Sequence, residues 1–274
     1  MTAPLLNDVL VLATTDTLTA QCPDGGMGPE FWSSMDINTW GICYANEFRN
    51  NPHYHNPVVL EAIMRLGDYN ESQFDRQKGF ISNVLGWDEW RMFAWMEATE
   101  RVAGEIDAAR LARWRDIFVL HGEHVLSQCL DMEHFDGAIP NHGIWNHAIF
   151  YRIGQLYNRH DFTDMATLAF ERIFASQTPD GCFREGGTSA GFPGSPVVMY
   201  NVTSMMAVNM YAGHSGNPEA QAALEKGFRW WWNTRWPDFA HIVAFDCRNR
   251  NHAEAFGVEG PTVHPLCVPA YFFN

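Results

Sequence analysis

Apolar residues recur every three or four positions through most of this 274-residue chain, which is the spacing of an amphipathic α-helix. The pattern predicts eight helices, at 5–20, 57–66, 87–103, 108–130, 142–157, 163–176, 198–212 and 218–234. Alternation of apolar and polar residues, which is typical of a half-buried strand, occurs only weakly, at 243–245. We therefore expect an all-α fold with substantial loops.

Two of the loops share one sequence pattern. Gln-x-Pro-Asp-Gly follows the first predicted helix at 21–25 and the sixth at 177–181. Weaker echoes occur at 86–88 and 136–137. Proline ends a helix and Asp-Gly makes a tight turn with positive φ at glycine, so the chain reverses there. The aspartates of the four loops are 64, 48 and 44 residues apart, which suits degenerate repeats of a two-helix hairpin.

A series of antiparallel helix pairs joined by such turns resembles the α/α toroid superfamily. In that architecture, helix hairpins form a ring with an inner and an outer layer, and the resemblance implies a deep cleft at one end of the inner helices. Eight helices make fewer hairpins than a complete toroid has, so we expect an incomplete (α/α)n toroid. We predict one domain over 1–274, as an open ring or as part of a larger protein, with an irregular C-terminal flap at 252–274.

Charge and hydropathy exclude several classes of partner. Acidic residues outnumber basic ones 32 to 18, for a net charge of -14, which argues against nucleic acid and against anionic membrane surfaces. No apolar run reaches the roughly 18 residues of a membrane-spanning helix. The N-terminal apolar stretch has no Lys or Arg before it, and Asn7 and Asp8 interrupt it. We therefore expect no signal peptide and, by default, a cytoplasmic location.

The cysteine and histidine patterns give no metal motif. None of the six cysteines forms a C-x-x-C pair, so we expect buried, small apolar side chains. None of the twelve histidines matches H-E-x-x-H, and His142 and His147 are five residues apart, off one helix face. We predict no metal and no cofactor. His53 and His55, in an Asn-rich loop, are candidates to line a cleft.

Two segments are candidates for catalysis. Asn141 and His142 stand at a predicted helix start, where Asn141 is either a helix cap or, with His142, projects into a cleft that favours an anion. Tyr200 begins another helix after a Gly- and Pro-rich loop. Its phenol either packs at a hairpin corner or lies at the cleft floor, able to transfer a proton.

These segments together resemble alginate lyases and heparinase-like lyases. Asn141, His142 and Trp145 match the Asn-His and the Trp of their N-N-H-x-x-W segment, with Pro140 in place of the first Asn. Their P-D-G-x-x-x-E-G segment matches 179–186, including Glu185, and their Tyr matches Tyr200, 58 residues after His142. The resemblance covers roughly 110–235. The family's Arg before the Tyr has no counterpart between 185 and 200, and its β-sandwich is absent from this chain.

The resemblance implies β-elimination on a glycan that contains uronic acid. Asn141 would bind the substrate carboxylate and stabilise the enolate-like charge that develops. His142 or a deprotonated Tyr200 would take the C5 proton, and Tyr200 would protonate the glycosidic oxygen at C4. Trp145 and Glu185 would contact substrate.

A local excess of positive charge is a second candidate for binding. Residues 226–250 hold five bases and two acids in an otherwise acidic chain. An acidic polymer would enter at such a patch. Arg248 and Arg250, with His252, are candidates to bind a carboxylate, although a solvated loop of paired charges is an equal alternative. Of the tryptophans at 230–232 and 236, one or two are candidates for a sugar-stacking platform.

Three other functions stay open. Asp88 and Glu89, between two tryptophans, suggest a glycoside hydrolase with paired carboxylates, with Glu185 as a further candidate acid, although acids are also ordinary in a first helical turn. A non-catalytic carbohydrate-binding toroid would bind without turnover. An isoprenoid cyclase shares the turn pattern but would need an acidic run that this sequence lacks.

Overall fold

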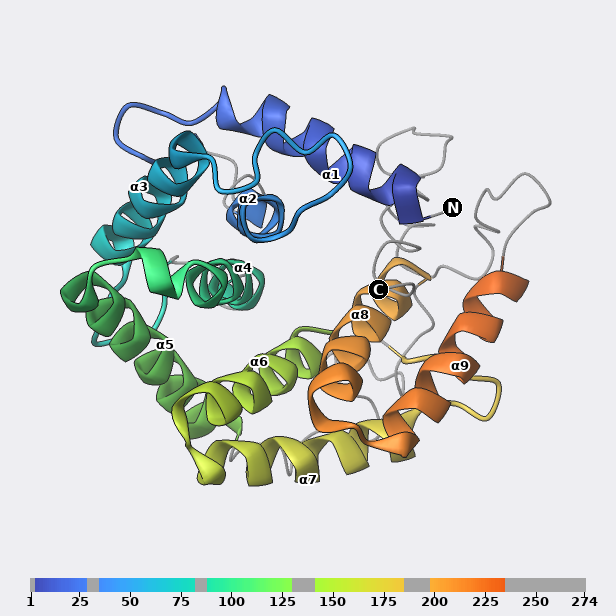
Figure 1. Ribbon diagram of the computed structural model, residues 1–274. Coiled ribbons are helices and arrows are strands. Elements are labelled where there is room, and N and C mark those ends of the chain that lie inside the picture. The colour runs from blue at the N-terminus through green and yellow to red at the C-terminus, as the bar shows by residue number, and fades with distance from the viewer. Residues whose placement is uncertain (1–2, 29–34, 82–87, 130–140, 185–197, 235–274) are drawn as a thin grey trace, which may run out of the picture. The chain divides into compact units, whose positions relative to one another are not determined.

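The computed structural model describes residues 3–28, 35–81, 88–129, 141–184 and 198–234, and these residues form helices and connecting loops (Figure 1). Within them there is no strand, only one isolated bridge between Asp75 and Phe80. The all-α prediction is confirmed. The helices are α1 (Ala3–Leu18), α2 (Asp36–Ala45), α3 (Pro57–Gln73), α4 (Asp88–Arg101), the short 3₁₀-helix η2 (Ala103–Glu105), α5 (Ala108–Cys129), α6 (Asn141–Tyr157), α7 (His160–Ser176), α8 (Val198–Ser215) and α9 (Pro218–Asn233).

All eight predicted helices are present, but α2 was not predicted. Most of its side chains are buried, including Ile37, Trp40 and Cys43, so it has too little polar surface to show helical periodicity. The predicted helix at 57–66 continues to Gln73, and the one at 163–176 begins earlier, at His160. The weak strand at 243–245 and the flap at 252–274 lie outside the described residues.

The chain divides into two compact units, residues 1–125 and 126–274. In the first unit, α2 packs against α1, α3 and α4. The indole of Trp40 is fully buried and donates from Nε1 to Thr17 Oγ1 at 2.8 Å. Gly41 lies where a Cβ would come within 2.9 Å of the Ala98 Cα. This close approach of α2 and α4 explains why α2 has glycine at its centre.

In the described part of the second unit, the helices form two hairpins. A short turn joins α6 to α7, and Phe150 stacks on Phe162 across this pair at 4.3 Å between ring centroids. A second short turn joins α8 to α9. Tyr211 of α8 stacks on Phe170 at 3.8 Å and meets the ring of Tyr151 edge-on at 4.9 Å. Aromatic packing therefore links α8 to both helices of the first hairpin.

The two Gln-x-Pro-Asp-Gly turns make the same contacts, each within its own unit. In the first, Gln21 Nε2 donates to the carbonyl oxygens of Gly25 at 2.9 Å and Ala62 at 3.0 Å. In the second, Gln177 Nε2 donates to those of Gly181 and Ala223, both at 2.9 Å. Each glutamine thus closes its own turn and ties it to the second helix that follows, α3 or α9.

The helices that receive these turns also begin alike. Asn56 caps α3 and Asn217 caps α9, each by accepting a backbone N–H two residues later, and each is followed by proline. The repeat is therefore present in both units as helix, turn, helix and Asn-Pro-capped helix. Of the weaker echo at 86–88, only Asp88 lies within the described residues, and it begins α4. The echo at 136–137 lies outside the described residues.

Replacing Gln21 with alanine should lower the free energy of unfolding by about 2 kcal/mol. The reason is that the carbonyl oxygens of Gly25 and Ala62 lose the hydrogen bonds that Gln21 Nε2 donates to them. Gln177→Ala should cost about as much, since its contacts are the same. Urea unfolding followed by circular dichroism measures both. Gln73→Ala is the matched control, because this exposed side chain bonds only to the neighbouring Ser72. Equal losses in all three variants would contradict the role given to the turns.

Candidate functional site

The first candidate segment lies at the start of α6. This helix begins at Asn141, one residue before the predicted start. Asn141 is fully buried, and His142 is partly exposed. Backbone N–H groups at a helix N-terminus favour an anion, which is the property the candidate site requires.

The second candidate segment lies in the first turn of α8. Tyr200 is partly exposed, and its carbonyl oxygen accepts a hydrogen bond from Thr203 Oγ1 at 3.0 Å. Its neighbour Asn201 is fully buried. Tyr200 is therefore neither fully buried nor fully exposed, next to a residue of the core.

The contacts between α6 and α8 relate these two segments. Gln155 Nε2 donates to the His214 carbonyl oxygen at 2.8 Å, and the rings of Tyr151 and Tyr211 meet at 4.9 Å. The partners are 59 and 60 residues apart, and both contacts lie in the C-terminal halves of the two helices. Asn141 and Tyr200 stand in the first turns of α6 and α8, two helices that pack against each other.

The predicted substrate contacts have different outcomes. Trp145 is buried, with 3% of the residue exposed, and its predicted contact with substrate stays a prediction. Of the three consecutive tryptophans in α9, the first two are buried and Trp232 is half-exposed, with its ring stacked on Phe228. Glu185, Arg248, Arg250, His252 and Trp236 lie outside the described residues.

His53 and His55 both contact neighbouring helices of the first unit. His53 is buried, and its Nε2 lies 2.9 Å from Thr15 Oγ1 of α1. His55 has a positive φ of 46°. It directly precedes the Asn-Pro cap of α3, as Gly216, also at positive φ, precedes the Asn-Pro cap of α9. Its ring meets that of Tyr44, and Nδ1 lies 3.9 Å from Glu105. Both histidines therefore tie their loop to neighbouring helices, and their predicted place in a cleft stays untested.

The paired acids of the alternative hydrolase are both buried at the start of α4, with Asp88 at 5% and Glu89 at 2% exposure. Asp88 Oδ2 accepts the backbone N–H of Ile81 at 2.6 Å, so this carboxylate holds the preceding loop. Sequence analysis missed a third acid, Asp36, at the start of α2. Burial raises the pKa of Asp36 to about 6, which makes it a candidate acid–base group in its own right.

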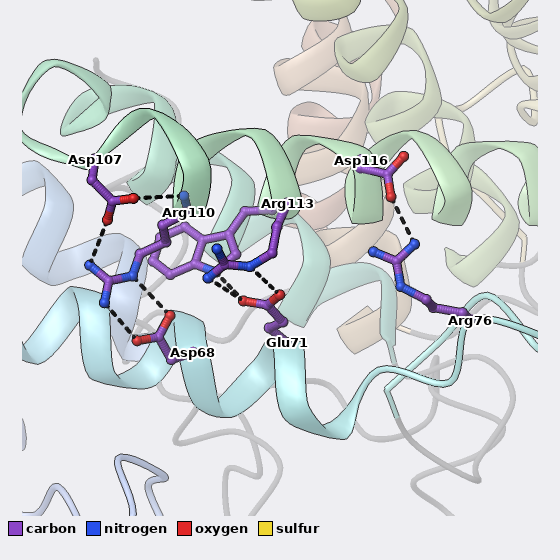
Figure 2. A network of polar contacts seen from close by, with 8 residues as sticks. Asp68, Glu71, Arg76, Asp107, Arg110, Arg113 and Asp116 are labelled. Atoms are coloured by element: carbon purple, nitrogen blue, oxygen red, sulfur yellow. Dashed lines mark hydrogen bonds and ion pairs between the residues drawn. The ribbon is translucent and has the colours of Figure 1, made fainter.

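Several arginines of the first unit are engaged between α3 and α5, as Figure 2 shows. Arg110 pairs with Asp68 at 3.0 Å and Asp107 at 3.2 Å, and Arg113 pairs with Glu71 at 2.8 Å. These partly exposed pairs contribute little stability each. Because Arg110 and Arg113 already pair with carboxylates, their charges are neutralised locally. This surface is therefore a poor binding site for an acidic polymer.

Cys43 and Cys182 are buried, as the sequence predicts, whereas Cys22 is only partly buried. Among the described residues, none of these three cysteines is in a disulfide. Burial raises the pKa of Cys182 to about 12, so this thiol is not a nucleophile near neutral pH. Among the described side chains, no three His, Cys, Asp or Glu residues gather as metal ligands.

Two buried histidines, His121 and His147, make the stability of the protein depend on pH. The ring of His121 lies with Nδ1 2.9 Å from the Gly79 carbonyl oxygen, so Nδ1 carries the proton and donates. His147 has the same arrangement with Gly143 at 2.6 Å. Burial lowers the pKa of both imidazoles, and for His121 the charge of Asp88 opposes this shift in part.

Because the folded pKa lies below the unfolded value of about 6.5, the unfolded chain binds more protons in the interval between them. The free energy of unfolding should therefore fall as the pH drops below about 6.5, by up to about 1.4 kcal/mol per pH unit for each histidine. His121→Asn retains a donor near Gly79 but cannot ionise, so it should reduce this slope. Urea unfolding between pH 7.5 and about 5 tests this, and an unchanged slope in the variant would contradict it.

None of the described helices combines the length and the apolar character that crossing a bilayer requires. The chain was compared with protein-family models, with curated proteins and with solved structures, and none of the three comparisons returned a match.

Proposed function

We propose that this protein is a polysaccharide lyase that cleaves a glycan containing uronic acid by β-elimination. The observation that supports the proposal most directly is the packing of α6 against α8 in the second unit, which includes the contacts of Gln155 with His214 and of Tyr151 with Tyr211. An amide and an imidazole at the start of α6 and a phenol in the first turn of α8 therefore belong to two helices that contact each other. This combination is suited to removing a proton from carbon beside a carboxylate.

Each residue has a distinct role in the proposed reaction. Asn141, with the N-terminal N–H groups of α6, binds the uronate carboxylate and stabilises the charge that develops on it. His142 or the Tyr200 phenolate takes the C5 proton, and the electron pair of that bond forms the C4–C5 double bond. The C4–O bond breaks, and Tyr200 protonates the departing glycosidic oxygen. The reaction uses neither a metal nor an organic cofactor.

We propose for the architecture an incomplete α/α toroid. The support comes from each unit separately. Both contain the same turn, bridged by glutamine to the second helix that follows, and both pair alternate helices, α2 with α4 and α6 with α8. Such a repeat is the local pattern from which helix-hairpin rings are built.

The test is incubation of the purified protein with a panel of uronate-containing and neutral glycans. A lyase produces a C4–C5 unsaturated sugar, which absorbs in the ultraviolet, and mass spectrometry finds fragments that together have gained no water. New reducing ends with a gain of one water and no ultraviolet absorbance would instead identify a hydrolase. Binding of an acidic glycan without either product would identify a non-catalytic carbohydrate-binding protein.

Two variants separate lyase from hydrolase at the level of residues. Asn141→Ala should abolish elimination, because the carboxylate loses the group that stabilises its developing charge. Asp88→Asn retains an oxygen that accepts from Ile81 and should leave elimination unchanged, while it would inactivate a hydrolase that depends on this acid. The reverse result would favour the hydrolase.

A further inference from the structure

Asn201 joins three segments around the start of α8. Its side chain is fully buried. Oδ1 accepts the backbone N–H of Phe183, in the segment after the second Gln-x-Pro-Asp-Gly turn, at 2.8 Å. Nδ2 donates to the Gly227 carbonyl oxygen of α9 at 3.5 Å. One amide therefore satisfies a donor and an acceptor from two other parts of the unit.

The packing around this amide leaves little room for rearrangement. A Cβ at Gly227 would lie 2.8 Å from Met205 Sδ and 3.3 Å from the ring of Phe183, so α8, α9 and the turn segment approach closely here. Interiors packed in this way do not deform continuously. The rotation of the first turn of α8 about its axis is thus fixed by the two hydrogen bonds of Asn201.

The direction of Tyr200 follows from that rotation. Successive residues of an α-helix differ by about 100° around the axis, so a fixed direction for Asn201 also fixes the direction in which its neighbour leaves the helix. We propose that Asn201 is the positioning residue for Tyr200, acting by holding the first turn of α8 against Phe183 and Gly227. This inference rests on the proposed function, in which Tyr200 transfers the proton.

The first test is the kinetics of Asn201→Ala. A small misplacement of a reacting group costs about 10²-fold in rate, so kcat for elimination should fall by about 10²-fold with little change in KM. Asn201→Asp retains an oxygen that accepts from Phe183, and because burial favours the protonated carboxyl group, its second oxygen can still donate to Gly227. It should therefore recover a large part of kcat, and it supplies a second variant if the alanine variant does not fold.

Gln177→Ala is the matched control. It also removes two hydrogen bonds from a side chain to backbone, and it frees the same turn segment from α9, but its bonds do not involve α8. We expect it to lower the melting temperature and to leave kcat unchanged at temperatures where the protein is folded. Equal losses of kcat in Asn201→Ala and Gln177→Ala, or no loss in Asn201→Ala, would overturn the positioning role.

A second readout does not depend on activity. The ionisation of Tyr200 is measured as the difference in ultraviolet absorbance between a protein with Tyr200 and its Tyr200→Phe variant, across alkaline pH. In the Asn201→Ala background the midpoint should shift, because the phenol takes up a new environment, whereas Gln177→Ala should leave it unchanged. If the wild-type protein eliminates no substrate, the proposed function fails, and this titration still decides whether Asn201 positions Tyr200. An unchanged midpoint in Asn201→Ala would refute it.

Discussion

Tyr200→Phe should lower kcat for elimination by about 10²- to 10⁴-fold, the range over which general acid–base groups contribute. The substitution removes one oxygen, and with it the proton that the glycosidic oxygen receives as the C4–O bond breaks. The aromatic ring remains, so the packing at the start of α8 should be retained. Initial rates of ultraviolet absorbance increase, measured with saturating and with limiting uronate substrate, give kcat and KM separately.

Tyr151→Phe is the matched control for this prediction. It makes the same chemical change on α6, ten residues after Asn141, at a ring that meets Tyr211 edge-on. It should leave kcat unchanged. A Tyr200→Phe variant that retains wild-type kcat would remove the phenol from the mechanism, and Asn141 and His142 would then have to act with another acid.

Sequence periodicity was sufficient to predict the helices that have a polar face. In α5, for example, Trp114, Ile117 and Phe118 are buried at the three- and four-residue spacing of an amphipathic helix. The pattern failed at α2, because a helix buried on most of its surface offers no contrast between faces. Boundaries were less accurate where a polar residue extends a helix, as at His160 in α7.

The candidate site could be predicted only in part. Local sequence was enough to place Asn141 and Tyr200 at helix starts, since Gly- and Pro-rich segments precede or flank both. The packing of their two helices depends on pairs such as Gln155 and His214, which are 59 residues apart and carry no local signal. The amide of Asn201 was missed for the same reason, because its partners are in two other segments.

The glycines of the two Gln-x-Pro-Asp-Gly turns are required by contacts with distant residues as well as by the local turn. Sequence analysis explained the glycine of each Gln-x-Pro-Asp-Gly turn by its positive φ, and Gly25 and Gly181 do have φ values of 95° and 109°. The contacts show a second requirement that local sequence could not reveal. A Cβ at Gly25 would lie 2.6 Å from the Arg65 carbonyl oxygen, and one at Gly181 would overlap that of Lys226. Both glycines therefore also permit the turn to contact the backbone of the second following helix.

Gly181→Ala should consequently be among the most destabilising single substitutions in the chain. A non-glycine residue at positive φ costs about 1–2 kcal/mol, and forcing a methyl group into a packed site costs about 1–3 kcal/mol. The clash is with the helix backbone of α9, which cannot rotate away as a side chain would. The free energy of unfolding should fall by about 2–5 kcal/mol, measured by urea unfolding at neutral pH.

Gly216→Ala separates the two causes. Gly216 also has a positive φ, of 66°, but a Cβ there would meet no atom within 4 Å. This variant should lose only the conformational part, about 1–2 kcal/mol. The difference between the two variants measures the close approach of the turn to α9. If Gly181→Ala and Gly216→Ala are destabilised equally, backbone conformation alone accounts for the glycine that the two turns share, and the packing of glycine against the helix contributes nothing.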